Sequence, residues 1–129
     1  MGSPKKLSAF AFFPAKGEVL PEPLGVILIF SSWNFHSGQY QLGTQWILKP
    51  SDQAPACSSL LANTIPLYLD CNAIKVIEGG PETSERLLQL KMDKIFFTGS
   101  PRVGQLVMFA AAKHLTPVVL ELGGNALPS

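Results

Sequence analysis

The sequence predicts an α/β fold of the doubly wound class, in which helices cover both faces of a parallel sheet. Short runs of apolar, mostly branched residues alternate along the chain with longer stretches of helical character. The run at residues 24–30 is continuous rather than alternating, as in a strand that is buried on both faces. Strands that follow one another through helices pair in parallel, so this order of elements predicts a parallel sheet with crossover helices.

Five stretches are predicted to be strands. The first is the run LGVILIF at residues 24–30, which contains no polar residue. The other four are WILK at 46–49, AIKVI at 73–77, KIFFTG at 94–99 and PVVLEL at 117–122. Residues 1–23 are expected to form an irregular lead that contains several prolines.

The first predicted helix opens near Ser51 and runs to about Leu69. Pro66 is expected to kink or end it, because proline lacks the N–H that the helix needs. The face that packs inward is expected to carry Leu60, Leu61, Thr64 and Leu67.

Two further helices are predicted from their starting residues. Pro81 suits a first helical position and is followed by ETSERLLQLK at residues 82–91. Ser100 is a good N-cap and Pro101 a good first residue for RVGQLVMFAAAKH at 102–114.

Composition and charge exclude several classes of protein. The chain of 129 residues is 47% apolar, and only 15% of its residues are charged. A net charge of +1 gives no footprint for nucleic acid, and no apolar run has membrane-spanning length. Cys57 and Cys71 lack the spacing of a metal site. The low charge content indicates apolar surface that is either bare or covered by a partner.

Polar residues and glycines follow the predicted strands, at the edge where doubly wound sheets bind ligands. They are Trp33, Asn34, Lys49, Asp52, Gly79, Gly80, Thr98, Gly99, Ser100 and Glu121. Simpler roles stay open: Asn34 can satisfy a turn, Lys49 can be a solvated strand end, and Ser100 can be a plain helix cap. Glu121 follows an apolar run, where a carboxylate needs a partner or a function. The string GSPRVG is neither GxGxxG nor a P-loop.

Four strings together resemble the aldehyde dehydrogenase superfamily, most closely its class 3-like plant members. They are EPLGVILIFSSWNF, LKPSDQAPACSSLLANTIPLYLD, IKVIEGG and DKIFFTGSPRVGQLVMFAAAKHLTPVVLELGG. The resemblance implies an incomplete Rossmann-like parallel sheet. Residues 24–124 would form part of an NAD(P)-binding domain, and 125–129 a divergent tail.

The family oxidises aldehydes to carboxylic acids with NAD or NADP, and the resemblance implies roles for individual residues. Asn34 would donate its amide to the oxyanion of a thiohemiacetal, and Glu121 would be the general base that activates the deacylating water. Lys49 and Asp52 would hold the adenosine ribose, although the family usually has Glu where Asp52 stands. The other residues expected at the cofactor are Trp33, Gly79, Phe97, Thr98, Gly99, Ser100, Val103 and Leu122.

The catalytic cysteine of the family is not matched by any residue of this sequence, since neither Cys57 nor Cys71 stands in its motif. The chain is therefore expected to be inactive alone and to act on an aldehyde only as part of an intact homologue. The alternatives are a piece of an active enzyme from an incomplete gene model, a non-catalytic module that associates with full-length subunits, and a product that does not fold stably. A cytoplasmic location is expected.

Two stretches depart from the family pattern, HSGQYQLGTQW at residues 36–46 and NALP at 125–128. The codons of QYQLGTQW can encode AISAGNTV in another frame, which is typical of the family at this point. NALP can likewise be encoded by a shifted form of the family's sequence after LELGG. We interpret both as out-of-frame translation. A polar loop would then replace the first crossover helix, and strands 24–30 and 46–49 would lose cover on one face.

Overall fold

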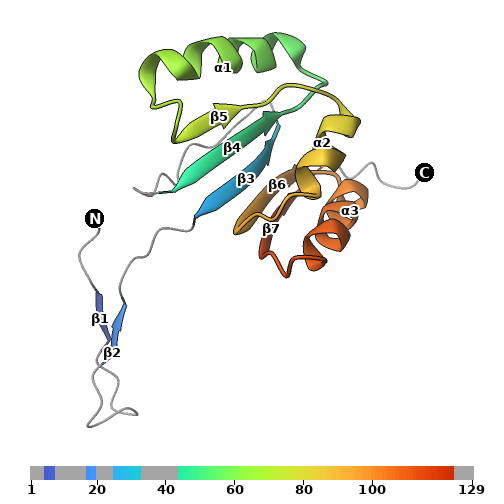
Figure 1. Ribbon diagram of the computed structural model, residues 1–129. Helices are drawn as coiled ribbons and strands as arrows, with labels where there is room; N and C mark the ends of the chain where they lie inside the picture. The colour runs from blue at the N-terminus through green and yellow to red at the C-terminus, as the bar shows by residue number, and fades with distance from the viewer. Residues whose placement is uncertain (1–4, 8–16, 20–24, 33–43, 124–129) are drawn as a thin grey trace.

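The centre of the protein is a five-stranded, all-parallel sheet, seen in a computed structural model that describes residues 5–7, 17–19, 25–32 and 44–123 (Figure 1). The strand order is β5-β4-β3-β6-β7. The strands are β3 (Val26–Ser31), β4 (Gln45–Pro50), β5 (Ile74–Val76), β6 (Lys94–Gly99) and β7 (Val118–Leu122). The helices are α1 (Pro55–Tyr68), α2 (Pro81–Leu88) and α3 (Pro101–Ala112). The predicted α/β class and parallel sheet are confirmed.

Two short strands stand in the segment that the sequence predicted to be irregular. They are β1 (Lys5–Leu7) and β2 (Gly17–Val19), which pair antiparallel with Lys5 opposite Val19. Three-residue strands are too short to show the alternation by which a strand is recognised in a sequence.

The central strand β3 divides its side chains between the two faces of the sheet, because neighbouring residues of a strand point in opposite directions. Leu28 and Phe30 face the side where α2 and α3 pack, which we call the pocket face. Ile27 and Ile29 face the side where α1 packs, which we call the α1 face. The pocket-face core is Leu28, Phe30, Leu87, Met92, Ile95, Phe97, Val107 and Ala111. The α1-face core is Ile27, Ile29, Trp46 and Leu48.

The predicted loss of cover on β3 and β4 is wrong. Ile27 and Leu48, which face α1, are only 1% and 2% exposed. Leu61 and Ile65 of α1 pack against this cluster. The apolar residues of both strands are therefore buried on this face, and α1 contributes to their cover.

Helix α1 begins later than predicted, at Pro55, and its inward face also differs from the prediction. Ser58, Leu61 and Ile65 face inward, whereas Leu60 and Leu67 are 65% and 77% exposed. The helix is apolar on several sides and has no charged residue, so its periodicity did not identify the packed face. Pro66 lies in the last turn, and the helix ends two residues later, at Tyr68.

Helices α2 and α3 begin where the sequence predicted. Pro81 and Pro101 occupy their first turns, and the Ser100 hydroxyl accepts a hydrogen bond from the Val103 N–H at 3.4 Å. Helix α2 ends at Leu88, three residues short of the prediction. No helix within the described ranges is long and apolar enough to cross a membrane.

Candidate functional site

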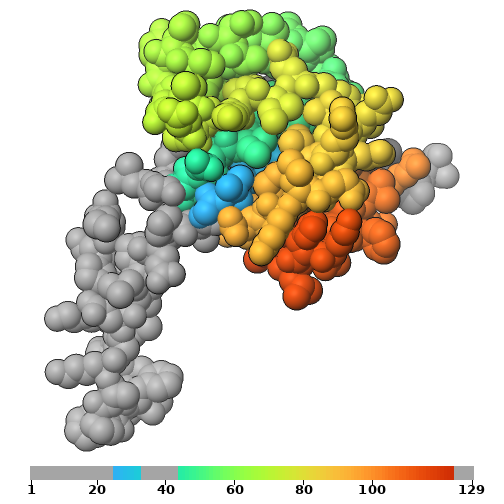
Figure 2. Space-filling view, in the orientation of Figure 1, coloured from blue at the N-terminus to red at the C-terminus, as the bar shows by residue number. Residues whose placement is uncertain are grey.

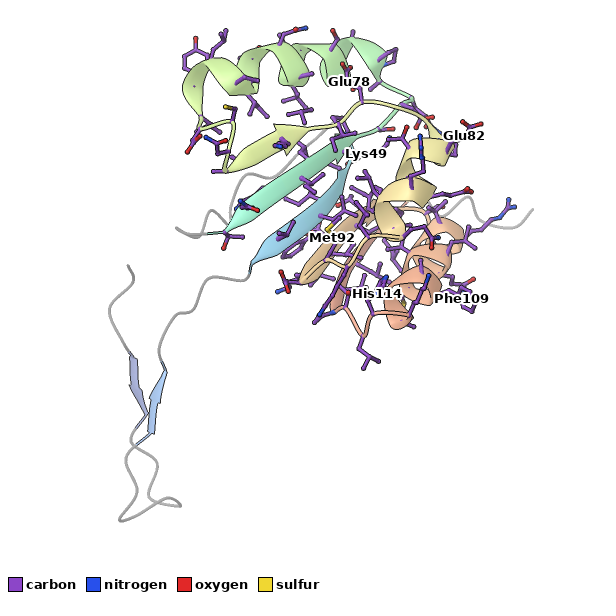
Figure 3. The ribbon with its side chains drawn as sticks, in the orientation of Figure 1. Lys49, Glu78, Glu82, Met92, Phe109 and His114 are labelled. Atoms are coloured by element: carbon purple, nitrogen blue, oxygen red, sulfur yellow. The ribbon has the colours of Figure 1, made fainter. Side chains whose placement is uncertain are left out.

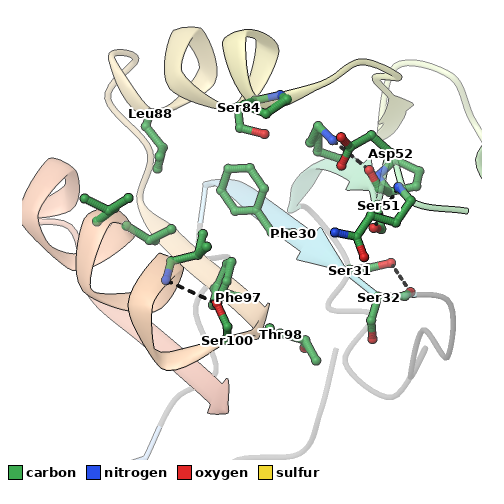
Figure 4. Close-up of a pocket in the computed structure, with 18 of the residues that line it drawn as sticks. Phe30, Ser31, Ser32, Ser51, Asp52, Ser84, Leu88, Phe97, Thr98 and Ser100 are labelled. Carbon is green, nitrogen blue, oxygen red and sulfur yellow. Dashed lines mark hydrogen bonds between the residues drawn. The ribbon is translucent and has the colours of Figure 1, made fainter. Parts of the chain in front are cut away.

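A pocket of about 740 Å³ opens on the pocket face, at the carboxyl ends of β3, β4 and β6 and between α2 and α3 (Figure 4). Strand β4 follows β3 in the chain and pairs with one edge of it, whereas β6, which comes later, pairs with the opposite edge of β3. Such a reversal of strand order leaves a crevice between the two crossover connections, which is where α/β sheets bind ligands. The pocket therefore lies where the fold class predicts a site.

Lys49 contributes a buried amino group to the wall of this pocket (Figure 3). Lys49 is 4% exposed, and it is paired with Phe30 of β3 in the sheet register. The Nζ donates a hydrogen bond of 2.8 Å to the carbonyl oxygen of Pro50. Burial lowers the pKa of Lys49, and the nearby Asp52 carboxylate opposes this change. The site thus holds a cation, or its neutral amine, in a poorly hydrated position.

Asp52 lies in the exposed turn after β4 and also lines the pocket. A Cβ atom added to Gly80 would lie 3.9 Å from its Oδ2. The carboxylate is therefore near the residue that precedes α2. Neighbouring Gly79 does not belong to the pocket lining; its φ of +145° is strained for other residues, and a Cβ there would collide with the Thr83 side chain.

The end of β6 and the start of α3 supply the opposite wall, where Phe97, Thr98, Gly99, Ser100 and Val103 all line the pocket. A Cβ on Gly99 would lie 2.7 Å from the Phe97 ring, so a larger residue cannot enter without moving that ring. The Ser100 hydroxyl caps α3. The positive end of the α3 dipole therefore lies at the pocket, where negative charge is stabilised.

Glu121 lies beyond the pocket lining, on the α1 face at the end of β7. Its register partner is Thr98, whose hydroxyl donates a hydrogen bond of 3.2 Å to Glu121 Oε2. The sequence suggested a buried carboxylate, but Glu121 is exposed because β7 is the last strand of the described sheet. Leu122 points to the pocket face but does not line the pocket either.

Trp33 and Asn34 lie outside the described residues, as do residues 36–43 and 125–128, in which the two frame changes were inferred. Cys57 and Cys71 are free and exposed, and neither lines the pocket. Among the described residues, no group of three or more potential metal ligands is assembled.

Several pocket residues escaped the sequence analysis. Phe30 is one of them; it meets the predicted Phe97 edge to face with ring centroids 6.2 Å apart, and both line the pocket. Strand alternation could have found Phe30, because it shares a face with Lys49. Helix α2 adds Ser84, Glu85 and Leu88, and α3 adds Leu106 and Val107. Their positions depend on helix packing, which no local sequence pattern signals.

Comparisons with known proteins agree with this architecture. The sequence profile of the aldehyde dehydrogenase family matches residues 13–127. Aldehyde dehydrogenase family 3 member F1 of Arabidopsis thaliana is 54% identical over 122 residues, which is 88% of this chain and 25% of that protein.

Solved structures give the same result. A substrate-bound Staphylococcus aureus AldH aligns with a TM-score of 0.78 and 36% identity, covering 94% of this chain and 28% of that one. An NAD-dependent aldehyde dehydrogenase from Sinorhizobium meliloti aligns with a TM-score of 0.64 and 30% identity, covering 80% and 23%. The chain thus spans about a quarter of the length of these relatives. It belongs to the aldehyde dehydrogenase family and resembles its class 3 members.

Proposed function

We propose that residues 24–124 form part of the NAD(P)-binding domain of an aldehyde dehydrogenase, whose reaction oxidises aldehydes to carboxylic acids. The observation that carries this proposal is the convergence of Lys49, Asp52 and the start of α3 on one pocket at the reversal of strand order. The Sinorhizobium meliloti relative is described as NAD-dependent, which supports a nicotinamide dinucleotide as the ligand.

The β4 side of the pocket suits the adenosine ribose. The Lys49 Nζ can donate to a ribose hydroxyl, and the Asp52 carboxylate can accept from one. Because Lys49 is buried, its hydrogen bond to a ligand faces little competition from water. Asp52 is one methylene shorter than the glutamate usual in the family, so a ribose would have to lie closer to the turn after β4.

The β6 side suits the pyrophosphate and the adenine. Gly99 has no side chain to keep phosphate oxygens away from the backbone, and α3 presents its positive end there. Val103 and Leu106 add apolar surface against which an adenine ring could pack. The glycine, the helix end and the apolar side chains together fit a pyrophosphate with its adenine.

Glu121 is proposed as the general base on the other side of the sheet. Its carboxylate can take a proton from the deacylating water, and the Thr98 hydroxyl fixes one of its oxygens. We propose that Asn34 stabilises the oxyanion, as the resemblance implies. A bound NAD(P) would accept the hydride.

We propose that this chain by itself does not turn over aldehydes, because the reaction also needs a thiolate nucleophile. Cys57 lies in the first turn of α1 and Cys71 just beyond its end, and neither lines the pocket. Activity would then belong to a longer protein that contains these residues and a cysteine domain.

Two measurements on the purified chain test this function. Calorimetric titration with NAD and NADP is expected to show saturable binding of at least one of them. An absorbance assay with added aldehyde is expected to show no aldehyde-dependent NAD(P)H. Absence of binding by a cooperatively folded chain would contradict the cofactor role, and a clear aldehyde-dependent rate would contradict the inactivity.

A non-catalytic role in association with full-length homologous subunits is favoured by one observation. Helix α3, orange in Figure 2, lies at the surface and exposes Met108 and Phe109, with Phe109 84% exposed (Figure 3). Met108 and Phe109 are adjacent in the chain, and patches of exposed apolar side chains are typical of interaction sites. Co-purification with an intact class 3 homologue is expected, and Phe109→Ser should reduce it, whereas Thr64→Ser on α1 should not. Equal recovery of all three chains would argue against this role. A cytoplasmic location stays a prediction.

A further inference from the structure

Lys49 differs in its surroundings from every other lysine whose side chain the structure describes. Lys75, Lys91 and Lys113 are exposed, and Lys94 is half-buried. Lys49 is 4% exposed and lines a cavity large enough for a small molecule. Lys49 is therefore the one lysine among the described side chains that is both buried and part of the pocket wall.

The chemical state of this amine favours nucleophilic attack. Burial lowers the pKa of Lys49 although the Asp52 carboxylate opposes the change, so more of the amine is unprotonated near neutral pH than in an ordinary lysine. The other ionisable side chain of the pocket lining is Glu85, on α2. The Pro50 carbonyl accepts one N–H, and it can do so whether the amine is charged or neutral.

The remaining wall of the pocket suits a carbonyl compound with an apolar group. Phe30, Phe97, Leu88 and Leu106 line it. An aliphatic aldehyde would bury its chain against these residues while its carbonyl carbon approaches the amine. Confinement of both groups in one pocket raises their effective concentration.

We propose that Lys49 is a covalent modification site for small apolar aldehydes. The lone pair of the Nζ adds to the carbonyl carbon, and the carbonyl oxygen takes up a proton to give a carbinolamine. The nitrogen gives up one proton in this step; the hydroxyl then takes up a second proton from solvent and leaves as water while the nitrogen releases its last proton, and a neutral imine forms between Lys49 and the aldehyde. The step is reversible and needs no oxidant or reductant. It does not depend on cofactor binding.

Reductive trapping tests this proposal on the complete 129-residue chain. The folded protein is incubated with hexanal and cyanoborohydride at neutral pH, and the alkylated lysines are quantified over time by peptide mass spectrometry. Alkylation of Lys49 is expected to be several-fold faster than that of Lys75 and Lys91, the exposed internal controls. In urea, where the pocket is lost, the three rates should become equal.

Two results would overturn the proposal. One is alkylation of Lys49 no faster than that of Lys75 and Lys91 in the untreated chain. The other is a preference for Lys49 that persists in urea, which would make it a property of the local sequence rather than of the pocket. Because the comparison is made within one wild-type molecule, it does not depend on a variant that folds.

Discussion

The two faces of the sheet differ in the size of their cores and in whether they form a pocket. On the pocket face, α2 and α3 bury a core of eight residues and leave a crevice at the carboxyl ends of the strands. On the α1 face, α1 packs against a smaller core of residues from β3 and β4, and Glu121 lies exposed at the far edge. Strand alternation places Lys49 and Gly99 on one side and Thr98 and Glu121 on the other. The proposed cofactor site and the proposed general base can therefore be tested separately by substitution.

The largest effect is expected in the core of the pocket face. Leu28 is fully buried beneath the helices, so Leu28→Ala should lower the free energy of unfolding by about 2–5 kcal/mol. That is a large share of the about 5–15 kcal/mol typical of whole domains. Urea unfolding followed by circular dichroism measures it. Leu60→Ala, on the exposed side of α1, should change it by less than about 0.5 kcal/mol. Similar losses for both variants would contradict the assignment of inner and outer sides.

The next largest effect is expected on NAD(P) affinity, which should fall when a pocket-face residue is replaced but not when Glu121 is replaced. Lys49→Met should weaken NAD(P) binding roughly tenfold or more, because hydrogen bonds to charged groups contribute about 1.5–3 kcal/mol. Glu121→Gln should leave affinity unchanged, because Glu121 does not line the pocket. Calorimetric titration of the two variants against the wild type decides this. A stronger loss in Glu121→Gln than in Lys49→Met would mean that the cofactor binds elsewhere.

The smallest effect concerns the cap of α3. Ser100→Ala removes the acceptor for the Val103 N–H and should cost about 0.5–1 kcal/mol, near the low end for caps because the bond is 3.4 Å long. Thermal unfolding at fixed pH measures it. Ser59→Ala, within α1 and exposed, is the matched control and should cost nothing, because alanine favours a helix interior. An equal loss in both would show that the Ser100 hydroxyl does not cap α3.

The sequence predicted the elements that have strong local signals. Short, mainly apolar runs identified the five strands of the described sheet, and Ser100 with Pro101 located the start of α3, because these signals arise within a few residues of the chain. The packed side of α1 was predicted only in part: Leu61 packs inward as expected, but Leu60 and Leu67 are exposed, because a helix without charged residues has no clear polar side.

The candidate site was predicted in part for the same reason. Residues at strand ends, such as Lys49 and Gly99, follow from topology alone, and the structure brings them to one pocket. The contributions of α2, such as Ser84 and Leu88, depend on how that helix packs over the sheet. The separation of Glu121 from the pocket required the register between β6 and β7, which no local pattern encodes.

The position of β3 in the middle of the sheet has a consequence for how the chain folds during synthesis. Its first neighbour, β4, follows closely, but its second, β6, comes much later. The Val26 N–H, at the start of β3, donates to an Asp93 carboxylate oxygen 67 positions further along the chain. During synthesis, β3 therefore cannot pair on both edges until β6 has left the ribosome. Until then one edge of β3 stays unpaired and able to pair with another chain, which makes this a protein whose yield should depend on chaperones that bind early.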